Sequence, residues 1–313
     1  MNYDPLVSIY SLTYNSSDTI LETLESIKNL TYENIELVVS DDASKDNTVE
    51  ICSKWIEQNK SRFKRTKLLT VPNNTGIANN FHRAIKECKG EWFKGIAGDD
   101  ALFPDSITKL IEFTEHHPEA KMILGKSARY DTYLTDDHLI EIHGSSEDNI
   151  NKVSTARQQY EILLCWPCID APAMFYHRSV FDIPELQNCG YAGLEDYPRF
   201  LLYTKLGNRI YFCDEVLCKY RQSSKSVQRT NNYNNLITRS YLAHFFEETH
   251  NYFHGIEKVA RYVVNWHDWV NCYCKSGFLR KVFNIITYPI YWLFYRIQQK
   301  KIYQRIDNAL KKG

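Results

Sequence analysis

Short apolar runs alternate with amphipathic segments through the first 111 residues of the chain. The apolar runs are expected to be β-strands, and they occupy residues 6–12, 35–39, 67–71 and 92–96. The segments that follow them carry apolar residues at helical spacing, and they occupy residues 20–27, 48–56, 77–88 and 104–111. This alternation favours right-handed crossovers and a mostly parallel sheet flanked by helices. The sequence therefore predicts an α/β fold.

Polar clusters follow three of the four expected strands. The clusters are Thr13-Tyr14-Asn15, Asp41-Asp42 and Asp99-Asp100. In open parallel sheets, ligands bind beyond the carboxyl ends of the strands, where these clusters would meet. Folding alone gives little reason to gather polar side chains there, so we expect this edge of the sheet to hold the functional site.

A nucleotide bound at this edge would need a device other than a glycine-rich loop. The chain has no two glycines at the Gly-x-Gly spacing and no complete phosphate loop ending in Gly-Lys-Ser/Thr. Asp99 and Asp100 could bind a nucleotide through a metal ion, because adjacent carboxylates suit Mg²⁺ or Mn²⁺. Such an ion takes its remaining ligands from water and a diphosphate. The alternative is that this pair is only a turn or a helix cap. Asp41 and Asp42 are equally ambiguous: one carboxylate could accept a hydrogen bond from a base, or the turn could cap the helix beginning at Thr48.

Six motifs, in order along the chain, resemble those of the family 2 glycosyltransferases. They lie at residues 7–15, 36–48, 74–78, 90–100, 193–197 and 220–226. The fourth ends in Gly98-Asp99-Asp100, and the fifth contains Glu195-Asp196. Each motif is weak alone, but together they extend over residues 5–130 and 185–228. The resemblance implies a GT-A fold, a Rossmann-like sheet flanked by helices.

The resemblance also implies a reaction, in which a sugar moves with inversion from a nucleotide-diphosphate donor, favoured as a UDP-sugar, to a hydroxyl group. The residues that it places at the nucleotide are Thr13, Tyr14, Asn15, Asp41, Asp42, Asn74, Gly76, Asp99 and Arg221. It assigns Mn²⁺ or Mg²⁺ to Asp100 and Asp99, with Asp100 as the more direct ligand. It makes Asp196 the general base, with Glu195 beside it for acceptor binding. Whether Asp41 or Asp42 contacts the base stays open, although Asp42 is the lesser candidate.

Three positions depart from the pattern of many relatives. Ala97 stands where many have a further Asp, so we expect one carboxylate fewer at the metal site. Asn79 stands where many have Arg, which predicts a weaker base contact from the helix at 77–88. Gln222 stands where many have His, so a loop around the diphosphate would depend on Arg221 and nearby hydroxyls.

Two other functions stay open on the sequence alone. A sugar-nucleotide nucleotidyltransferase also uses paired acids and a metal, but it normally has a glycine-rich basic loop after its first strand, which residues 11–15 lack. An inactive carbohydrate-binding scaffold would not need the pairs Asp99-Asp100 and Glu195-Asp196. Turnover of a nucleotide sugar separates the three. The expected acceptor is a glycan or a lipid-linked sugar in bacterial surface polysaccharide synthesis.

The end of the chain is basic and aromatic. Residues 275–313 hold nine Lys and Arg against one acid, although the whole chain has zero net charge, which argues against nucleic-acid binding. Residues 282–295 are largely apolar, but as a helix they span only about 21 Å of a roughly 30 Å hydrocarbon core, and Pro289 would kink them. We therefore expect residues 277–303 to lie on a membrane surface. The alternative is a helix that docks on the catalytic domain or on a second subunit of a homo-oligomer.

A polar break at residues 231–235 divides the chain into two expected domains. They are a GT-A catalytic domain at residues 1–228 and a helical C-terminal region at 229–313. The nine cysteines are odd in number, and the first residues lack the basic and apolar regions of a signal peptide. We therefore expect reduced cysteines and a cytoplasmic protein, peripheral at the inner face of the cell membrane.

Overall fold

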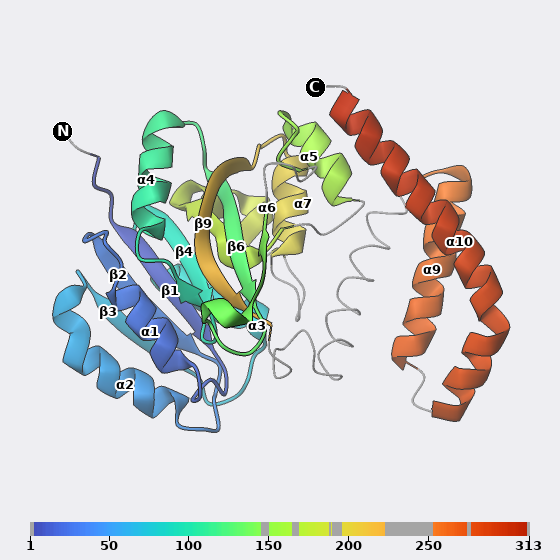
Figure 1. Ribbon diagram of the computed structural model, residues 1–313. Coiled ribbons are helices and arrows are strands. Elements are labelled where there is room, and N and C mark those ends of the chain that lie inside the picture. Colours follow the sequence, from blue (N-terminus) through green and yellow to red (C-terminus); the bar gives the residue numbers. More distant parts are fainter. Residues whose placement is uncertain are drawn as a thin grey trace.

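Four parallel strands form the half of the sheet that the sequence predicts most directly. The computed structural model describes residues 3–144, 150–164, 169–187, 189, 196–222, 253–273 and 277–311. The strands β1 (Val7–Thr13), β2 (Ile35–Asp41), β3 (Thr66–Thr70) and β4 (Trp92–Ala97) lie in the order β3-β2-β1-β4, and every neighbouring pair is parallel. The intervening helices are α1 (Ile20–Lys28), α2 (Thr48–Asn59) and α3 (Ile77–Glu87) (Figure 1). Each of these elements begins and ends within a few residues of its expected position.

The second half of the sheet mixes parallel and antiparallel pairs. Its strands are β5 (Ala101–Leu102), β6 (Met122–Tyr130), β7 (Leu139–His143), β8 (Met174–His177) and β9 (Tyr211–Arg221). The order continues as β4-β8-β6-β9-β5, with β7 also paired to β6; β6 and β9 are parallel, and the other pairs are antiparallel. The helices here are α4 (Ser106–His116), α5 (Ala156–Leu163), α6 (Pro184–Gln187) and α7 (Tyr197–Lys205). The expected α/β fold class is confirmed; the expected parallel pairing holds throughout the first half of the sheet, whereas most pairs of the second half are antiparallel.

The two halves join at the antiparallel pair of β4 and β8. The rings of Trp92 and Phe175 stack across it with 4.7 Å between centroids, and both side chains are buried. Lys94 on β4 is fully buried, and its Nζ donates to the carbonyls of Met174, at 3.2 Å, and Pro172. Burial lowers the pKa of this ammonium group. The seam is thus held by stacked rings and by one buried cation.

A buried carboxylate fastens the amino-terminal ends of the parallel strands. Glu36 on β2 accepts hydrogen bonds from Ser8 Oγ of β1 at 2.5 Å, from Gly90 N at 3.1 Å and from Lys89 N. Its second oxygen lies 3.1 Å from Arg65 Nη1, just before β3. One side chain therefore connects β1, β2, β3 and the turn into β4.

The α9–α10 hairpin stands at the end of the molecule away from α1 and α2 (Figure 1). It consists of α9 (Gly255–Tyr273) and α10 (Gly277–Lys311), and Pro289 lies within the continuous α10. Glu257 of α9 accepts two hydrogen bonds from Arg305 of α10, at 2.8 and 2.9 Å. Arg261 lies 3.5 Å from the same carboxylate, and both guanidinium groups cover the ring of Phe253. This buried cluster fixes the two helices to each other.

Helix α5 connects this hairpin to α7. Near the start of α5, Gln158 Nε2 donates to Ala309 O of α10 at 2.6 Å. At its end, Leu163 O accepts from Tyr197 Oη of α7 at 2.5 Å. Ile302 and Ala309 are buried, so the carboxyl-terminal part of α10 docks on the rest of the chain. In the described part of the chain, no helix is both long and apolar enough to cross a bilayer. The expected domain boundary near 229–235 lies outside the described residues.

Replacing Glu36 tests its role in the strand ends. Glu36→Ala leaves Arg65 and several buried donors without their acceptor, so we expect it to lower the free energy of unfolding by about 3–5 kcal/mol. Glu33→Ala is the matched control, because that exposed carboxylate lies 3.7 Å from Arg62 and should contribute about 0.5 kcal/mol or less. Urea denaturation measures both, and equal losses would contradict this role.

Candidate active site

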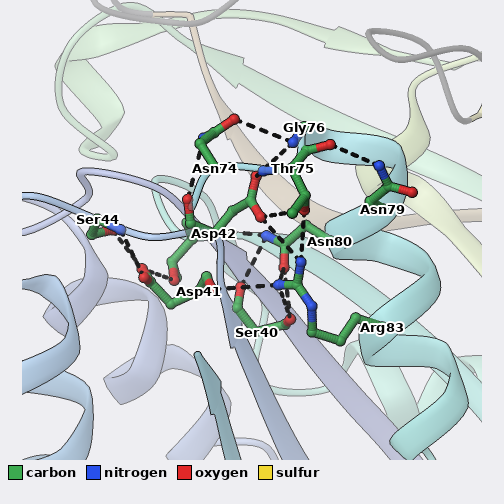
Figure 2. Close-up of polar contacts among 11 residues, drawn as sticks. Ser40, Asp41, Asp42, Ser44, Asn74, Thr75, Gly76, Asn79, Asn80 and Arg83 are labelled. Atoms are coloured by element: carbon green, nitrogen blue, oxygen red, sulfur yellow. Dashed lines mark hydrogen bonds and ion pairs between the residues drawn. The ribbon is translucent and has the colours of Figure 1, made fainter. Parts of the chain in front are cut away.

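The loop after β1 and the acidic turn after β2 are held together by hydrogen bonds. Thr13 Oγ1 donates to Asp41 Oδ2 at 2.9 Å. Asn15 N donates to Ser44 Oγ at 2.8 Å, and Asn15 Oδ1 accepts from Lys45 N at 2.7 Å. Asp41 Oδ1 accepts from Ser44 N at 2.8 Å, a contact drawn in Figure 2. The parallel register thus brings two of the predicted polar clusters into one group.

Both of these loops contain a non-glycine residue with a positive φ angle. Asn15 has φ 51°, and Ala43 has φ 67°. The left-handed region costs a residue with a Cβ roughly 1–2 kcal/mol, and such conformations gather at functional sites. Tyr14 lies in the chain between Thr13 and Asn15, which both contact the acidic turn, and about half of Tyr14 is exposed. Both loops therefore adopt a backbone conformation of higher energy than an ordinary turn requires.

Asp42 holds the loop between β3 and α3. Its carboxylate accepts hydrogen bonds from Thr75 N at 2.9 Å, Gly76 N at 2.8 Å and Thr75 Oγ1 at 2.6 Å (Figure 2). Asn74 Nδ2 donates to Asp42 O at 3.2 Å. The predicted residues Asn74 and Gly76 therefore meet Asp42. The amides that precede α3 are occupied by this carboxylate, so they are not a free phosphate site of the kind that helix N-termini often provide.

Neither Asp41 nor Asp42 caps α2. The first turn of that helix contacts Asp46 instead, whose Oδ1 accepts from Thr48 N at 3.0 Å. The helix-cap alternative for the acidic pair is therefore wrong, although Asp41 does form a local turn contact with Ser44. The Asp42 carboxylate is fully used by the β3–α3 loop and Arg83. Asp41, which lies beside the β1 loop, accepts fewer hydrogen bonds from the protein than Asp42 does.

Arg83 is a member of this group that the sequence did not reveal. It lies on α3 four residues after Asn79, the position where many relatives carry Arg. Its Nη2 donates to Asp42 Oδ1 at 3.1 Å and to Thr75 Oγ1 at 2.7 Å (Figure 2). Its Nη1 donates to Asn80 Oδ1 at 3.0 Å. Residues four apart share a helix face, and this spacing was the signal that could have identified it.

Asp99 and Asp100 follow β4 and lie against Arg221 at the end of β9. Asp100 is 1% exposed; its Oδ1 accepts from Arg221 N at 2.8 Å, whereas none of the described residues donates a hydrogen bond to its buried Oδ2. Arg221 Nε donates to Asp99 O at 2.7 Å, and its guanidinium also contacts Glu22 and the carbonyl of Thr132. Burial, and then Asp99, raise the pKa of Asp100 well above its usual value; burial also raises that of Asp99.

This arrangement fits a cation. Two adjacent carboxylates, one with a buried oxygen that no described residue hydrogen-bonds, match the oxygen ligands that Mg²⁺ and Mn²⁺ prefer. Within the described ranges, no cluster of three or more His, Cys, Asp or Glu side chains has metal-binding geometry. A divalent ion held by Asp99 and Asp100 would therefore complete its shell with water or ligand oxygens. Gly98 allows the close approach of the β1 loop, because a Cβ there would lie 3.0 Å from Thr13 Cγ2.

Asp196 lies at the amino terminus of α7, the helix that α5 supports. Its carboxylate accepts from Tyr197 N at 2.6 Å. Burial raises the pKa of Asp196, which suits a carboxylate that takes up a proton. Glu195, the expected neighbour for acceptor binding, lies outside the described residues. The helix N-terminus adds a favourable field for the anion.

Asp170, which precedes β8, is a second group that the sequence did not reveal. Its carboxylate pairs with Arg129 at 2.8 and 3.0 Å, with His143 Nδ1 at 3.0 Å and with Ser127 Oγ at 2.5 Å. Burial alone would raise its pKa, but these hydrogen bonds hold the pKa of Asp170 below its usual value. Its charge also contributes to the raised pKa values of both Asp100 and Asp196.

The comparisons with known proteins decide the family. The sequence profile described as "Glycosyl transferase family 2" matches residues 8–183, more than half of the chain. The chain belongs to glycosyltransferase family 2. The glycosyltransferase GlyG of Streptococcus pneumoniae is 30% identical over 232 residues, which are 72% of this chain and 73% of GlyG. This membership confirms the resemblance and argues for glycosyl transfer over nucleotidyl transfer.

Other relatives of this glycosyltransferase match over shorter segments. The enzyme WfaP of Escherichia coli, described as a UDP-Glc:alpha-D-GlcNAc-diphosphoundecaprenol beta-1,3-glucosyltransferase, is 35% identical over 112 residues, 35% of this chain and 41% of WfaP. Several curated relatives match over only about two fifths of their own length (43%, 40% and 41%). This chain therefore spans less than half the length of these relatives.

Solved structures share the fold of this glycosyltransferase at low sequence identity. TarS 1–349 of S. aureus in complex with UDP has a TM-score of 0.54 and 17% identity, over 98% of this chain and 91% of TarS 1–349. The mannosyltransferase PcManGT of Pyrobaculum calidifontis, in complex with GDP-Man and Mn²⁺, has a TM-score of 0.58 and 13% identity, over 99% and 87%. The expected GT-A fold is confirmed.

Proposed function

We propose that this glycosyltransferase moves a sugar, with inversion, from a UDP-sugar to a hydroxyl of a glycan or lipid-linked acceptor during synthesis of a bacterial surface polysaccharide. The observation that carries the proposal is the Oδ2 of Asp100, which has no hydrogen-bond donor among the described residues and lies beside Asp99, at the strand edge where the polar groups of β1 and β2 gather. WfaP, by its description, uses a UDP-sugar and a diphospholipid acceptor, and TarS binds UDP. A panel of UDP-, GDP- and dTDP-sugars, scored by release of nucleoside diphosphate, tests the proposal.

The donor side is built from the first two polar clusters. Asp41, fixed by Thr13 and Ser44, offers an anionic acceptor for a base N–H, and Tyr14 offers an exposed ring beside it. Asp42 acts indirectly, since it and Arg83 hold Asn74 and Gly76 in place as the opposite side of the same region. We therefore assign the base contact to Asp41 and a positioning role to Asp42.

The diphosphate side belongs to Asp99 and Asp100. These residues would hold Mn²⁺ or Mg²⁺, which supplies charge neutralisation for the departing diphosphate when it is bound. Arg221 adds positive charge next to them, although its guanidinium is already hydrogen-bonded to protein groups. The amides before α3 already bind Asp42 and are not available to a phosphate. The negative charge of the diphosphate would therefore be neutralised by the ion that Asp99 and Asp100 would hold.

The acceptor side centres on Asp196. In a single displacement, its carboxylate takes the proton of the acceptor hydroxyl while the new glycosidic bond forms and the bond to the diphosphate breaks. The raised pKa of Asp196 makes it a stronger base than an exposed Asp. Inversion follows because the acceptor attacks the face opposite the leaving group and no enzyme nucleophile intervenes.

Replacing Asp100 tests the metal pair. Asp100→Ala should abolish divalent-dependent turnover and the rise in melting temperature that Mn²⁺ with UDP gives the wild type; ligand at 100 times its Kd stabilises by about 2.7 kcal/mol. Asp105→Ala is the control, since that surface carboxylate pairs only with Lys109 at 2.9 Å among its described ion pairs. Full turnover in a chelator, or in Asp100→Ala, would overturn the metal assignment.

Replacing Asp196 tests the base. Asp196→Asn keeps the size of the side chain but cannot accept a proton, so kcat should fall by roughly 10²–10⁴-fold. UDP with Mn²⁺ should still protect the variant against melting, because donor binding does not need the base. Asp182→Asn, at the end of the 3-10 turn Arg178–Asp182, is the matched control. Turnover within a few-fold of wild type would move the base elsewhere, with Glu195 the first suspect.

We also propose that α10 attaches the enzyme to the cytoplasmic face of the membrane. Its docked part ends near Ile302, whereas Ile285, Ile286 and Leu293 are 77%, 68% and 58% exposed. Ile285, Pro289 and Leu293 follow one another at four-residue spacing, which puts them on one face. Arg296 lies 4.0 Å over the Trp292 ring next to this face, and Lys300 follows. Apolar side chains edged by cations suit an anionic lipid surface.

A triple variant tests this attachment without removing the docked part of α10. Ile285→Gln, Ile286→Gln and Leu293→Gln together should weaken binding to phosphatidylglycerol vesicles by at least about tenfold, since each buried Ile or Leu contributes roughly 1.5–3 kcal/mol. High salt should weaken wild-type binding only in part. Leu21→Gln, Ile140→Gln and Leu206→Gln form the control, because these exposed residues lie elsewhere. Unchanged co-sedimentation, or loss of a defined oligomer instead, would overturn the proposal.

A further inference from the structure

Arg199 is a buried cation that the reaction described above does not use. It lies on α7, three residues after Asp196, and is only 1% exposed. Among the described residues, none accepts a hydrogen bond from its Nε or Nη2, and both atoms are buried. Burying a guanidinium that forms no ion pair with a described carboxylate is costly, so its position calls for a compensating role.

Two aromatic rings surround this guanidinium. Its central carbon lies 4.3 Å from the ring centroid of Phe81 on α3 and 5.6 Å from that of Phe181. Phe81 follows Asn80, whose side chain bonds Ser40 Oγ at 2.6 Å and Ser40 O at 3.0 Å at the end of β2. The cation–π contact therefore joins the helix that carries Asp196 to the helix that supports the donor side.

Among the described residues, the titratable groups that interact with Arg199 are His82 on α3, Cys189 before α7 and Asp196 at the start of α7. Lys86, also on α3, is a further cation near His82. Burial, then Arg199 and Lys86, lower the pKa of His82, and burial raises the pKa of the Cys189 thiol. Burial and Asp170 raise the pKa of Asp196, whereas the Tyr197 N–H and Arg199 lower it. Arg199 also lowers the pKa of the Cys189 thiol, through its charge and a side-chain hydrogen bond, so Asp196 is the carboxylate of this set that the buried cation favours in its charged form.

We propose that Arg199 is a positioning residue for sugar transfer: its buried charge, one turn along α7, keeps Asp196 in the anionic form that can accept a proton, and its stacking on Phe81 sets α7 against α3. The inference rests on the proposed role of Asp196 as the base. Residues three apart on a helix are neighbours, so the charge reaches the carboxylate without a direct ion pair. A direct pair would bind the proton-accepting oxygens that the acceptor needs.

The test is the pH dependence of turnover in variants that separate charge from packing. Arg199→Met and Arg199→Gln remove the charge, and Arg199→Lys keeps it. The assay follows UDP release from UDP-glucose, UDP-galactose and UDP-N-acetylglucosamine with Mn²⁺ between pH 5 and 9. Loss of the cation raises the pKa of Asp196, so its acidic limb in kcat/KM should move to higher pH in the Met and Gln variants. The Lys variant should keep the wild-type limb, even with a lower kcat.

Each outcome decides the proposal. An unmoved limb in both uncharged variants, an equal shift in all three variants, or failure of both uncharged variants to fold would overturn it, since the last shows a structural role. His82→Asn is the control for the neighbouring imidazole and should leave the limb in place. Asp196→Asn in the same assay separates the two hypotheses: if it stays active, the base assignment fails; if it is inactive while the limb is unmoved, only the role of Arg199 fails.

Discussion

The parallel alignment of β1, β2 and β4 is the constraint on which the site depends. The register pairs Thr13 of β1 with Asp41 of β2, and Leu12 with Ala97 at the end of β4. Three loops therefore leave the sheet at one level, and each begins with polar residues. Both faces of β1 and β2 are buried, so a slip in register would disrupt the packing on each face. The register thus brings the polar groups together, and their own hydrogen bonds then hold them.

This placement carries electrostatic strain. Asp99, Asp100 and Asp196 all have raised pKa values, chiefly through burial, and Asp170 adds a fourth carboxylate among them. Nearby groups stabilise these carboxylates: Arg129 pairs with Asp170, the Arg221 amide donates to Asp100, and the buried Arg199 lies near Asp196. Carboxylates kept so close are expected where a cation and a proton are to be exchanged. The buried carboxylates at this edge lower the free energy of unfolding, and the apolar core below them offsets that cost.

The sequence predicted the elements whose signals are local. The apolar runs and helical faces of residues 6–111 located β1 to β4 and α1 to α4, and the resemblance located Asp41, Asp99 and Asp100 at their ends. Arg83 and Arg199 could not be predicted in the same way, because each acts through a partner on another element, Asp42 or Phe81. Asp170 escaped because residues 131–190 have no clear period, and its partners on β6 and β7 are 27 to 43 residues away. The apolar stretch of α10 was visible, but the docking of its last turns on Gln158 depends on a contact 151 residues apart.

The hydrogen bonds of Asp42 also have a consequence for how the donor diphosphate would be neutralised. In many sheet enzymes, the amides before a helix neutralise a phosphate and are a permanent part of the fold. In this chain the corresponding amides, Thr75 N and Gly76 N, are spent on the protein's own anion. If Asp99 and Asp100 hold the proposed divalent ion, donor affinity would depend on the free concentration of that ion, and by reciprocity the ion would be retained better when donor is present. Occupancy of the site would then depend on the ionic medium as much as on the polypeptide.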